Sequence, residues 1–126
     1  MKLQNAYITE ANFLGNFNAI GYNMNSGTNF EYGESLASHS VALPAADAST
    51  ATWHAVAKNA LNDCTAGSTW QLFAEGTTSG NSVNWDGGLA KGNGYTAGNK
   101  VTTTKGTFAN ECIVLTNGFK TIADNN

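Results

Sequence analysis

The spacing of apolar residues changes once along this chain, near Gly15, and that change limits the folds open to it. Before Gly15, apolar residues recur at steps of three and four. This predicts an amphipathic helix over residues 2–15, whose packing face consists of Leu3, Ala6, Tyr7, Ala11 and Leu14. Gly15 is the expected C-cap, because a residue without Cβ readily adopts the left-handed conformation that ends helices. After it, short alternating stretches separated by Gly and Asn predict an antiparallel sheet of about four or more strands. The expected class is therefore α+β, with one N-terminal helix packed on that sheet.

The alternating pattern predicts six strands, at residues 28–35, 38–45, 51–61, 68–76, 99–107 and 110–119. Residues 51–61 also contain Ala, Lys and Leu, which favour helix, so a helix competes with the strand that we favour there. The glycine-rich stretch 77–99 is either a wide surface loop or two irregular strands around Asp86-Gly87, a dipeptide typical of hairpins. We expect a single domain over residues 1–126, made of the end of a helix (1–15), a loop region (16–50), and a sheet with a C-terminal region (51–126).

The charge of the chain argues against a nucleic-acid partner. Charged residues are 12% of the 126 residues, about half the usual share, and six Lys and no Arg stand against nine acids. A net charge of -3 lacks the basic surface by which proteins bind phosphate backbones. No apolar run reaches the roughly 18 residues of a transmembrane helix, so the chain as given is expected to span no membrane.

Two cysteines, Cys64 and Cys112, are too few for a four-cysteine zinc site, and neither lies in a CxxC pair. They are either two buried thiols of a cytosolic protein or one disulfide, which we favour. A bridge would close a loop of about 49 residues, for which the chain-entropy model gives about 4 kcal/mol. A disulfide would place the protein in an oxidising compartment.

The sequence offers no pattern of catalytic residues. His39 and His54 are the only histidines, and no local signature places an activated nucleophile and an orienting carboxylate beside either of them. Paired carboxylates for glycoside hydrolysis are improbable with so few acids, and the alternating acids of a calcium-binding EF-hand loop are missing. We therefore expect no enzyme activity, no cofactor and no metal site.

Aromatic residues raise a second function, carbohydrate binding through flat rings that stack on sugars. The candidates are Trp53, Trp70, Trp85, Tyr32 and Tyr95. Trp53 and Trp70 lie in alternating stretches and are expected in the core, whereas Trp85 lies in the glycine-rich stretch. Trp85 and Tyr95 are therefore the candidate exposed contact residues.

Three segments together resemble the globular part of a bacterial type IV pilin. The first is "AYITEANFLGNFNAIGY" (6–22), where a helix ends in a G-x-F-x-x-I-G-Y turn that leads to "FEYGE". The second is "LNDCTAGSTWQL" (61–72), which is similar to the cysteine-then-tryptophan strand of short pilins. The third is the pair Cys64 and Cys112, which resembles the disulfide that closes the C-terminal region of the family. The strongest motif of the family is not in this chain, namely an apolar N-terminal helix that starts at Phe with Glu at its fifth position.

The resemblance implies a structural subunit of an extracellular type IV pilus or pilus-like filament, serving adhesion or motility. Its partners would be other copies of itself in a homopolymeric filament, together with surfaces or glycans. Contact with a membrane would be made only through the missing apolar half-helix, as a precursor in the inner membrane. Met1 would then stand midway through a longer helix, or the helix and the globular part would be separate products. The alternative function is a secreted or cell-surface carbohydrate-binding module.

Overall fold

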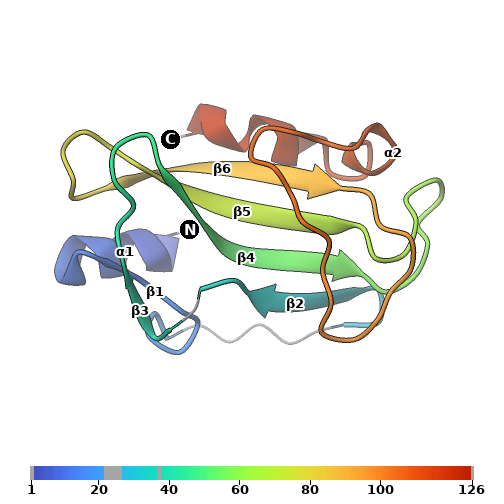
Figure 1. Cartoon of the computed structure of the whole chain (residues 1–126), viewed down its shortest axis with the longest axis horizontal. Helices are drawn as coiled ribbons and strands as arrows, with labels where there is room; N and C mark the ends of the chain where they lie inside the picture. Colours follow the sequence, from blue (N-terminus) through green and yellow to red (C-terminus); the bar gives the residue numbers. More distant parts are fainter. Residues whose placement is uncertain (1, 22–26, 37, 126) are drawn as a thin grey trace.

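The chain has an α+β fold, which is confirmed by a computed structural model that describes residues 2–21, 27–36 and 38–125 (Figure 1). Met1 and Tyr22, the last residue of the G-x-F-x-x-I-G-Y turn, lie outside these ranges. In chain order the elements are α1 (Lys2–Ala11), β1 (Phe13–Gly15), β2 (Phe30–Glu34), β3 (Ser40–Ala42), β4 (Ser49–Ala57), β5 (Thr69–Gly76), β6 (Val83–Ala90), α2 (Asn110–Ile113) and the 3-10 helix η1 (Asn117–Asn125).

Four strands form the main sheet in the order β2-β4-β5-β6, each antiparallel to its neighbour, while β1 and β3 form a separate antiparallel pair. The strands expected at residues 28–35, 38–45, 51–61 and 68–76 are confirmed as β2, β3, β4 and β5. The competing helix at residues 51–61 is wrong. Residues 106–109 run parallel to the outer edge of β6, where the N–H groups of Gly106 and Ala109 bond to carbonyls of that strand. This part of the β6 edge is therefore not open.

Strand register divides the main sheet into two faces. Trp70, Leu72 and Ala74 of β5 point to one face, which we call the helix face. It is covered by α1 at one end, where Ile8 packs with Ala74, and by the C-terminal helices at the other. Thr69, Gln71 and Phe73 point to the opposite face, the strap face. It is covered by residues 91–107, the strap, which crosses in front of the strands in Figure 1.

The packing face expected for the N-terminal helix is wrong in part. The buried residues of α1 are Gln4 and Ile8, whereas Leu3 is 45% exposed and Ala6 is also exposed. Gln4 is buried because its amide bonds to both backbone groups of Gly15, at 2.7 Å to the carbonyl oxygen and 2.8 Å from the N–H. A hydrophobic pattern does not identify a glutamine as a core residue. The packing face expected from sequence is therefore rotated about the helix axis relative to the observed one.

The remaining residues of the expected face have mixed positions. Tyr7 and Ala11 are half-buried, and the Tyr7 hydroxyl bonds to Ser40 Oγ at 2.6 Å. Leu14 is fully buried, but from β1 rather than from the helix. The helix ends earlier than expected because Asn12, and not Gly15, takes the left-handed conformation, with φ of 61°.

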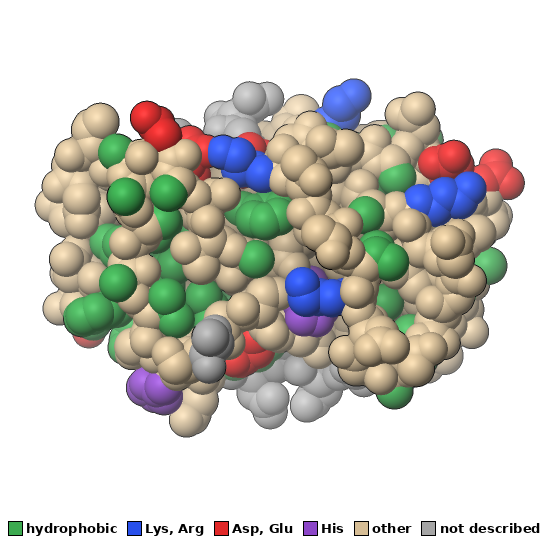
Figure 2. Space-filling view, in the orientation of Figure 1, with side chains coloured by type: hydrophobic (Ala, Val, Ile, Leu, Met, Phe, Trp, Pro, Cys, Tyr) green, Lys and Arg blue, Asp and Glu red, His purple; other side chains and the backbone are tan. Residues whose placement is uncertain are grey.

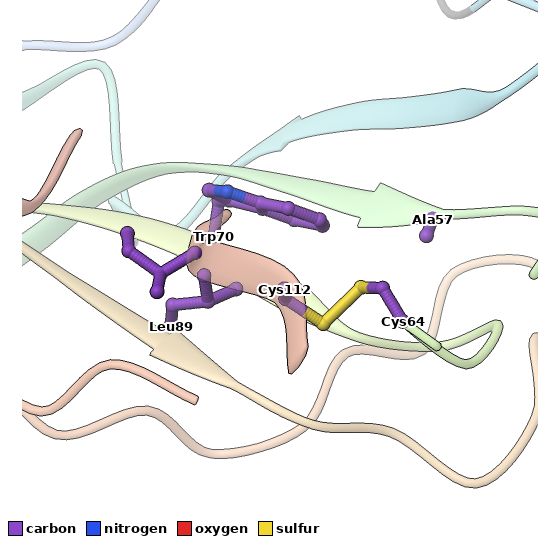
Figure 3. Packing of buried hydrophobic residues seen from close by; sticks show 6 residues of the cluster. Ala57, Cys64, Trp70, Leu89 and Cys112 are labelled. Carbon is purple, nitrogen blue, oxygen red and sulfur yellow. A yellow bond between two sulfur atoms is a disulfide. The ribbon is translucent and has the colours of Figure 1, made fainter. Parts of the chain in front are cut away.

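Cys64 and Cys112 form a disulfide, as expected. Both are fully buried and belong to a core cluster with Ala57, Trp70 and Leu89, which Figure 3 shows converging between β4, β5, β6 and the C-terminal segment. The disulfide joins the turn between β4 and β5 to α2. The indole N–H of Trp70 adds a 2.8 Å hydrogen bond to Thr116 Oγ1, just after α2.

The C-terminal strands expected at residues 99–107 and 110–119 are wrong. Residues 99–107 form no strand and belong to the strap, while residues 110–119 contain α2 and the start of η1. Apolar residues of this region are buried, but they pack down onto the finished sheet instead of extending it. Ile113 and Phe119 contact the cluster around Trp70. Alternation within a short segment does not distinguish these two ways of burying side chains.

The expected hairpin or loop around Asp86-Gly87 is also wrong, because both residues lie in the middle of β6. The glycines there serve close packing rather than a turn. A Cβ on Gly87 would lie 2.7 Å from the Phe119 ring, and one on Gly88 would lie 2.5 Å from the Thr104 carbonyl oxygen. Covering elements on the two faces of the sheet therefore require glycine at these neighbouring positions.

Removal of the disulfide tests how far the C-terminal segment depends on it. Because the bond joins residues 48 apart, the chain-entropy model predicts that Cys64→Ala/Cys112→Ala lowers the free energy of unfolding by about 4 kcal/mol. Guanidinium titration followed by tryptophan fluorescence measures the change. Val114→Ala, at a side chain that is 65% exposed, is the control and should change stability by less than about 0.5 kcal/mol. A loss of less than about 1 kcal/mol in the double variant would contradict this role of the disulfide.

Candidate functional site

Trp85, expected to be exposed for sugar contact, is only 4% exposed, so that prediction is wrong. It lies on β6 at the helix face and packs with Ile8 and Ala74 under α1. Its indole N–H donates to Asn5 Oδ1 at 3.0 Å. Trp85 therefore fastens the N-terminal helix to the sheet. Because its glycine-rich neighbourhood forms a strand and not a loop, the reason for expecting exposure does not hold.

Trp53 is held between two other rings and offers no flat surface for stacking on a sugar. Its ring stacks on Trp85 at a centroid distance of 6.2 Å and on Phe17 at 5.4 Å. Trp85 approaches from the β6 side of the sheet. Phe17 approaches from the β2 side, where its N–H bonds to Glu34 Oε1 at 2.8 Å. Trp70 is buried in the disulfide cluster, so none of the three tryptophans presents a free ring face.

The other candidate contact residue, Tyr95, is half-buried in the strap and is engaged by Glu31 of β2. The tyrosine hydroxyl donates to Glu31 Oε2 at 2.7 Å, and the N–H of Gly98 donates to Oε1 of the same carboxylate at 3.1 Å. The Tyr95 hydrogen bond lowers the pKa of Glu31, with smaller contributions in the same direction from Gly98 and Lys58. The same hydrogen bond raises the pKa of Tyr95. One carboxylate thus holds two groups of the strap at the β2 edge.

A chain of hydrogen bonds lies beside this carboxylate on the strap face, and its direction follows from Gln71. The Gln71 side-chain amide donates to the carbonyls of Trp53 (2.7 Å) and Leu72 (3.1 Å), so its Oε1 is the acceptor for Ser35 Oγ at 3.1 Å. Since Ser35 has one proton and donates it to Gln71, its oxygen accepts the 2.9 Å bond from His54 Nδ1. The neutral imidazole of His54 therefore carries its proton on Nδ1.

This direction decides what His54 and Ser35 can do chemically. A histidine that activates a serine must accept the hydroxyl proton, whereas here the imidazole donates to the serine oxygen. The pair is therefore arranged as a structural link between β4 and the end of β2 rather than as a nucleophile and base. Burial is the main cause that lowers the pKa of His54, and the positive charge of Lys100 lowers it further, while Glu31 acts in the opposite direction.

Sequence reasoning did not find the polar cluster of the strap face, which consists of Glu31, Ser35, His54, Gln71 and Tyr95. Its members are spread over 65 positions of the chain, and register brings His54 opposite both Gln71 and Gly33. Gly33 was the only local signal, because a Cβ there would lie 2.6 Å from His54 Nε2. Figure 2 shows a lysine side chain lying against a histidine near the middle of this face.

Exposed large apolar side chains lie at two places in the described part of the chain. Leu3 lies in the first turn of α1 and Phe13 (44% exposed) opens β1, while Val114 and Leu115 follow α2. These two places lie toward opposite ends of the long axis of the molecule (Figure 1). Hydrophobic side chains also gather toward the left end of the space-filling view, whereas the rest of that face is mostly uncharged and polar (Figure 2).

The described residues add no metal site or membrane span to this arrangement. Within them, no group of three or more His, Cys, Asp or Glu side chains could hold a metal ion. No helix of the described ranges is long and apolar enough to cross a membrane. Comparison of the chain with protein-family models, with curated proteins and with solved structures gave no match.

The position of Trp85 leads to a prediction about stability rather than sugar binding. Trp85→Ala removes a buried ring together with its bond to Asn5, and is expected to lower the free energy of unfolding by about 3–5 kcal/mol. Tyr95→Phe removes one hydroxyl at the surface and is expected to cost about 1 kcal/mol or less. Chemical denaturation measures both values. A Trp85→Ala variant of normal stability would contradict the buried role of this residue.

Proposed function

We propose that this chain is the globular part of a structural subunit of an extracellular type IV pilus or pilus-like filament, serving adhesion or motility. Its partners are other copies of itself, and it works by packing against them rather than by catalysis. The sequence resemblance to pilins motivates the family assignment. The fold is compatible with it, since one N-terminal helix packs on an antiparallel sheet whose C-terminal covering is fixed by a disulfide.

The observation that carries the proposal is the outward side of α1. Gln4 and Ile8 already fasten the inner side, yet Leu3 remains 45% exposed on the outside, together with Ala6 and with Phe13 directly after the helix. A surface helix of a free-standing protein normally presents charged and polar residues to water. Exposed apolar residues on the same helix supply a surface on which a neighbouring subunit can pack.

The surface composition supports close packing between copies. Charged residues are only 12% of the chain, and the described ion pairs, Lys91 with Glu111 and Lys105 with Glu75, neutralise four of them. A neutral surface rich in hydroxyl and amide groups repels a like copy weakly. The disulfide is typical of proteins outside the reducing cytosol, which fits a filament on the cell surface. In such a filament the outer side of the strap would be available to surfaces or glycans.

Loss of the outward apolar surface should prevent filament formation without unfolding the subunit. In cells that produce this chain, we expect deletion of its gene to remove a class of surface filaments that antibodies to the chain label in electron micrographs. Complementation with Leu3→Glu should restore the subunit on immunoblots but not the filaments, because a charge would be buried without a partner at the contact.

Val114→Glu provides the matched control, since Val114 is equally apolar and more exposed but lies outside α1. Filaments are expected to survive that change. Labelling of cells without filaments, or normal filaments in the deletion strain, would refute the proposed function. Filaments that survive Leu3→Glu would show that α1 is not the packing surface.

A further inference from the structure

The strap is held by backbone groups at its ends and only by side chains between them. At its start, the N–H of Gly92 bonds to Ser68 Oγ at 3.0 Å. At its end, the N–H of Gly106 bonds to the Gly87 carbonyl of β6 at 2.8 Å. Within the described part of the chain, no backbone group of residues 95–104 bonds to a backbone group of the main sheet.

Two side chains of the sheet hold this middle section. The carboxylate of Glu31 accepts from the Tyr95 hydroxyl and from the N–H of Gly98, while Thr69 Oγ1 accepts from the N–H of Val101 at 3.1 Å. These bonds can break without any change in the strand ladders, so the segment opens locally at a lower free-energy cost than global unfolding. The backbone in the middle of the strap is therefore easier to expose than that of the sheet.

Lys100 begins a stretch of this section that has an extended pattern of exposure. The residues from Lys100 to Thr104 belong to no helix, strand or turn. The side chains of Lys100, Thr102 and Thr104 are exposed, and the two between them are half-buried. Extended segments with available backbone groups are what a partner binds by adding a strand. An exposed lysine on such a segment fits a protease whose specificity pocket carries a carboxylate, as the pocket of trypsin does.

Lys91 and Lys105 also lie in the strap, but the peptide bond after each of them is held in place. The N–H that follows Lys91 is that of Gly92, which is buried and bonded to a serine side chain. The N–H that follows Lys105 is that of Gly106, which is bonded to the backbone of β6. By contrast, the N–H that follows Lys100 is held by a threonine hydroxyl alone.

The remaining three lysines lie in or next to regular structure. Lys2 begins α1, Lys120 lies in η1, and Lys58 follows β4, where its N–H bonds to the Asn29 carbonyl at 2.8 Å. Because the chain has six Lys and no Arg, a protease that requires a basic residue has no other sites. The bond after Lys100 is thus the one that such a protease reaches with the least unfolding.

We propose that the strap is a processing site, cut between Lys100 and Val101 by an endoprotease that recognises lysine. The step is a hydrolysis. The bond between the carbonyl carbon of Lys100 and the nitrogen of Val101 breaks, and one water supplies a hydroxyl group to the carbon and a proton to the nitrogen.

The cut leaves one molecule of two chains, because the disulfide spans it. Cys64 belongs to residues 1–100 and Cys112 to residues 101–126, so the two pieces stay covalently joined. The second piece also keeps its backbone bonds to β6. Hydrolysis therefore frees the middle of the strap without releasing the C-terminal cover of the sheet. It uncovers the hydroxyl of Thr69, which is buried in the uncut chain.

Limited digestion of the full chain with trypsin under native, non-reducing conditions tests the site. The product should run as one band without reductant and as two pieces, residues 1–100 and 101–126, after reduction. Lys100→Gln should slow the loss of intact chain by about tenfold or more, because the other sites open only with more extensive unfolding. Lys91→Gln is the matched control, since it changes another exposed lysine of the strap, and should leave the rate unchanged.

Reducing immunoblots of the chain from cells that produce it should show the same two pieces, whereas intact chain alone would overturn the proposal. A first cut by trypsin after Lys58, Lys91, Lys105 or Lys120 would also overturn it, as would equal rates for Lys100→Gln and the unmodified chain. A cut chain without a cooperative unfolding transition, followed by tryptophan fluorescence without reductant, would refute the stable two-chain product. The filament assays above change α1 and not the strap, so either proposal can fail without the other.

Discussion

Burial of β5 from both sides is the constraint on which the rest of the structure depends. Nearly every residue of this central strand is buried, so the sheet needs a cover on each face. Apolar residues at the helix face, such as Trp70, are covered by helices that bring apolar side chains of their own. The strap face contains Thr69 and Gln71, which need hydrogen-bond partners when they are buried. An irregular segment with free backbone N–H groups can supply them to Thr69. Backbone carbonyls of Trp53 and Leu72 and the hydroxyl of Ser35 complete the set for Gln71.

The parts of the fold that sequence predicted are those in which side-chain periodicity reflects burial directly. In β4 the residues of one face pack together: Ala55 lies opposite Trp70 across the register, and Ala57 belongs to the same core cluster. The prediction for the C-terminal region was wrong for a reason that side-chain periodicity cannot reveal. Its apolar residues are buried against a sheet that is already complete, and a disulfide to a distant turn fixes where they land. The position of Cys112 depends on its bond to Cys64. The sequence around Cys112 gives no sign of this distant partner.

The candidate site was less predictable than the fold because contacts between distant residues create it: Gly33 leaves room for the His54 ring, and Gln71 orders the hydrogen bonds of Ser35. Glycine and glutamine have similar roles elsewhere in the fold. Asp86-Gly87 is typical of a turn in sequence, yet Gly87 and Gly88 allow two covering elements to approach β6 closely. Gln4 is polar and lies outside the predicted packing face of the helix, yet its amide bonds to both backbone groups of Gly15 in β1. Each of these residues has a common role that local sequence suggests and a rarer structural role that depends on contacts with distant residues. The sequence suggests a buried Trp53 and an exposed Trp85. The order β4-β5-β6 in the sheet brings their two rings into a stack.

The disulfide also determines how the chain behaves when it is stretched. Residues 64 and 112 cannot separate while the bond is intact, and the chain that joins them, a sequence separation of 48, stays outside the path of a force applied at the two chain ends. This withholds roughly 160–170 Å of contour length that an unbridged chain would release on extension. The withheld part includes β5, β6 and the strap, whereas α1 and the first strands lie on the loaded path. In a pulled molecule the N-terminal elements and η1, which follows Cys112, therefore carry the tension, while the disulfide shields β5 and β6 from it.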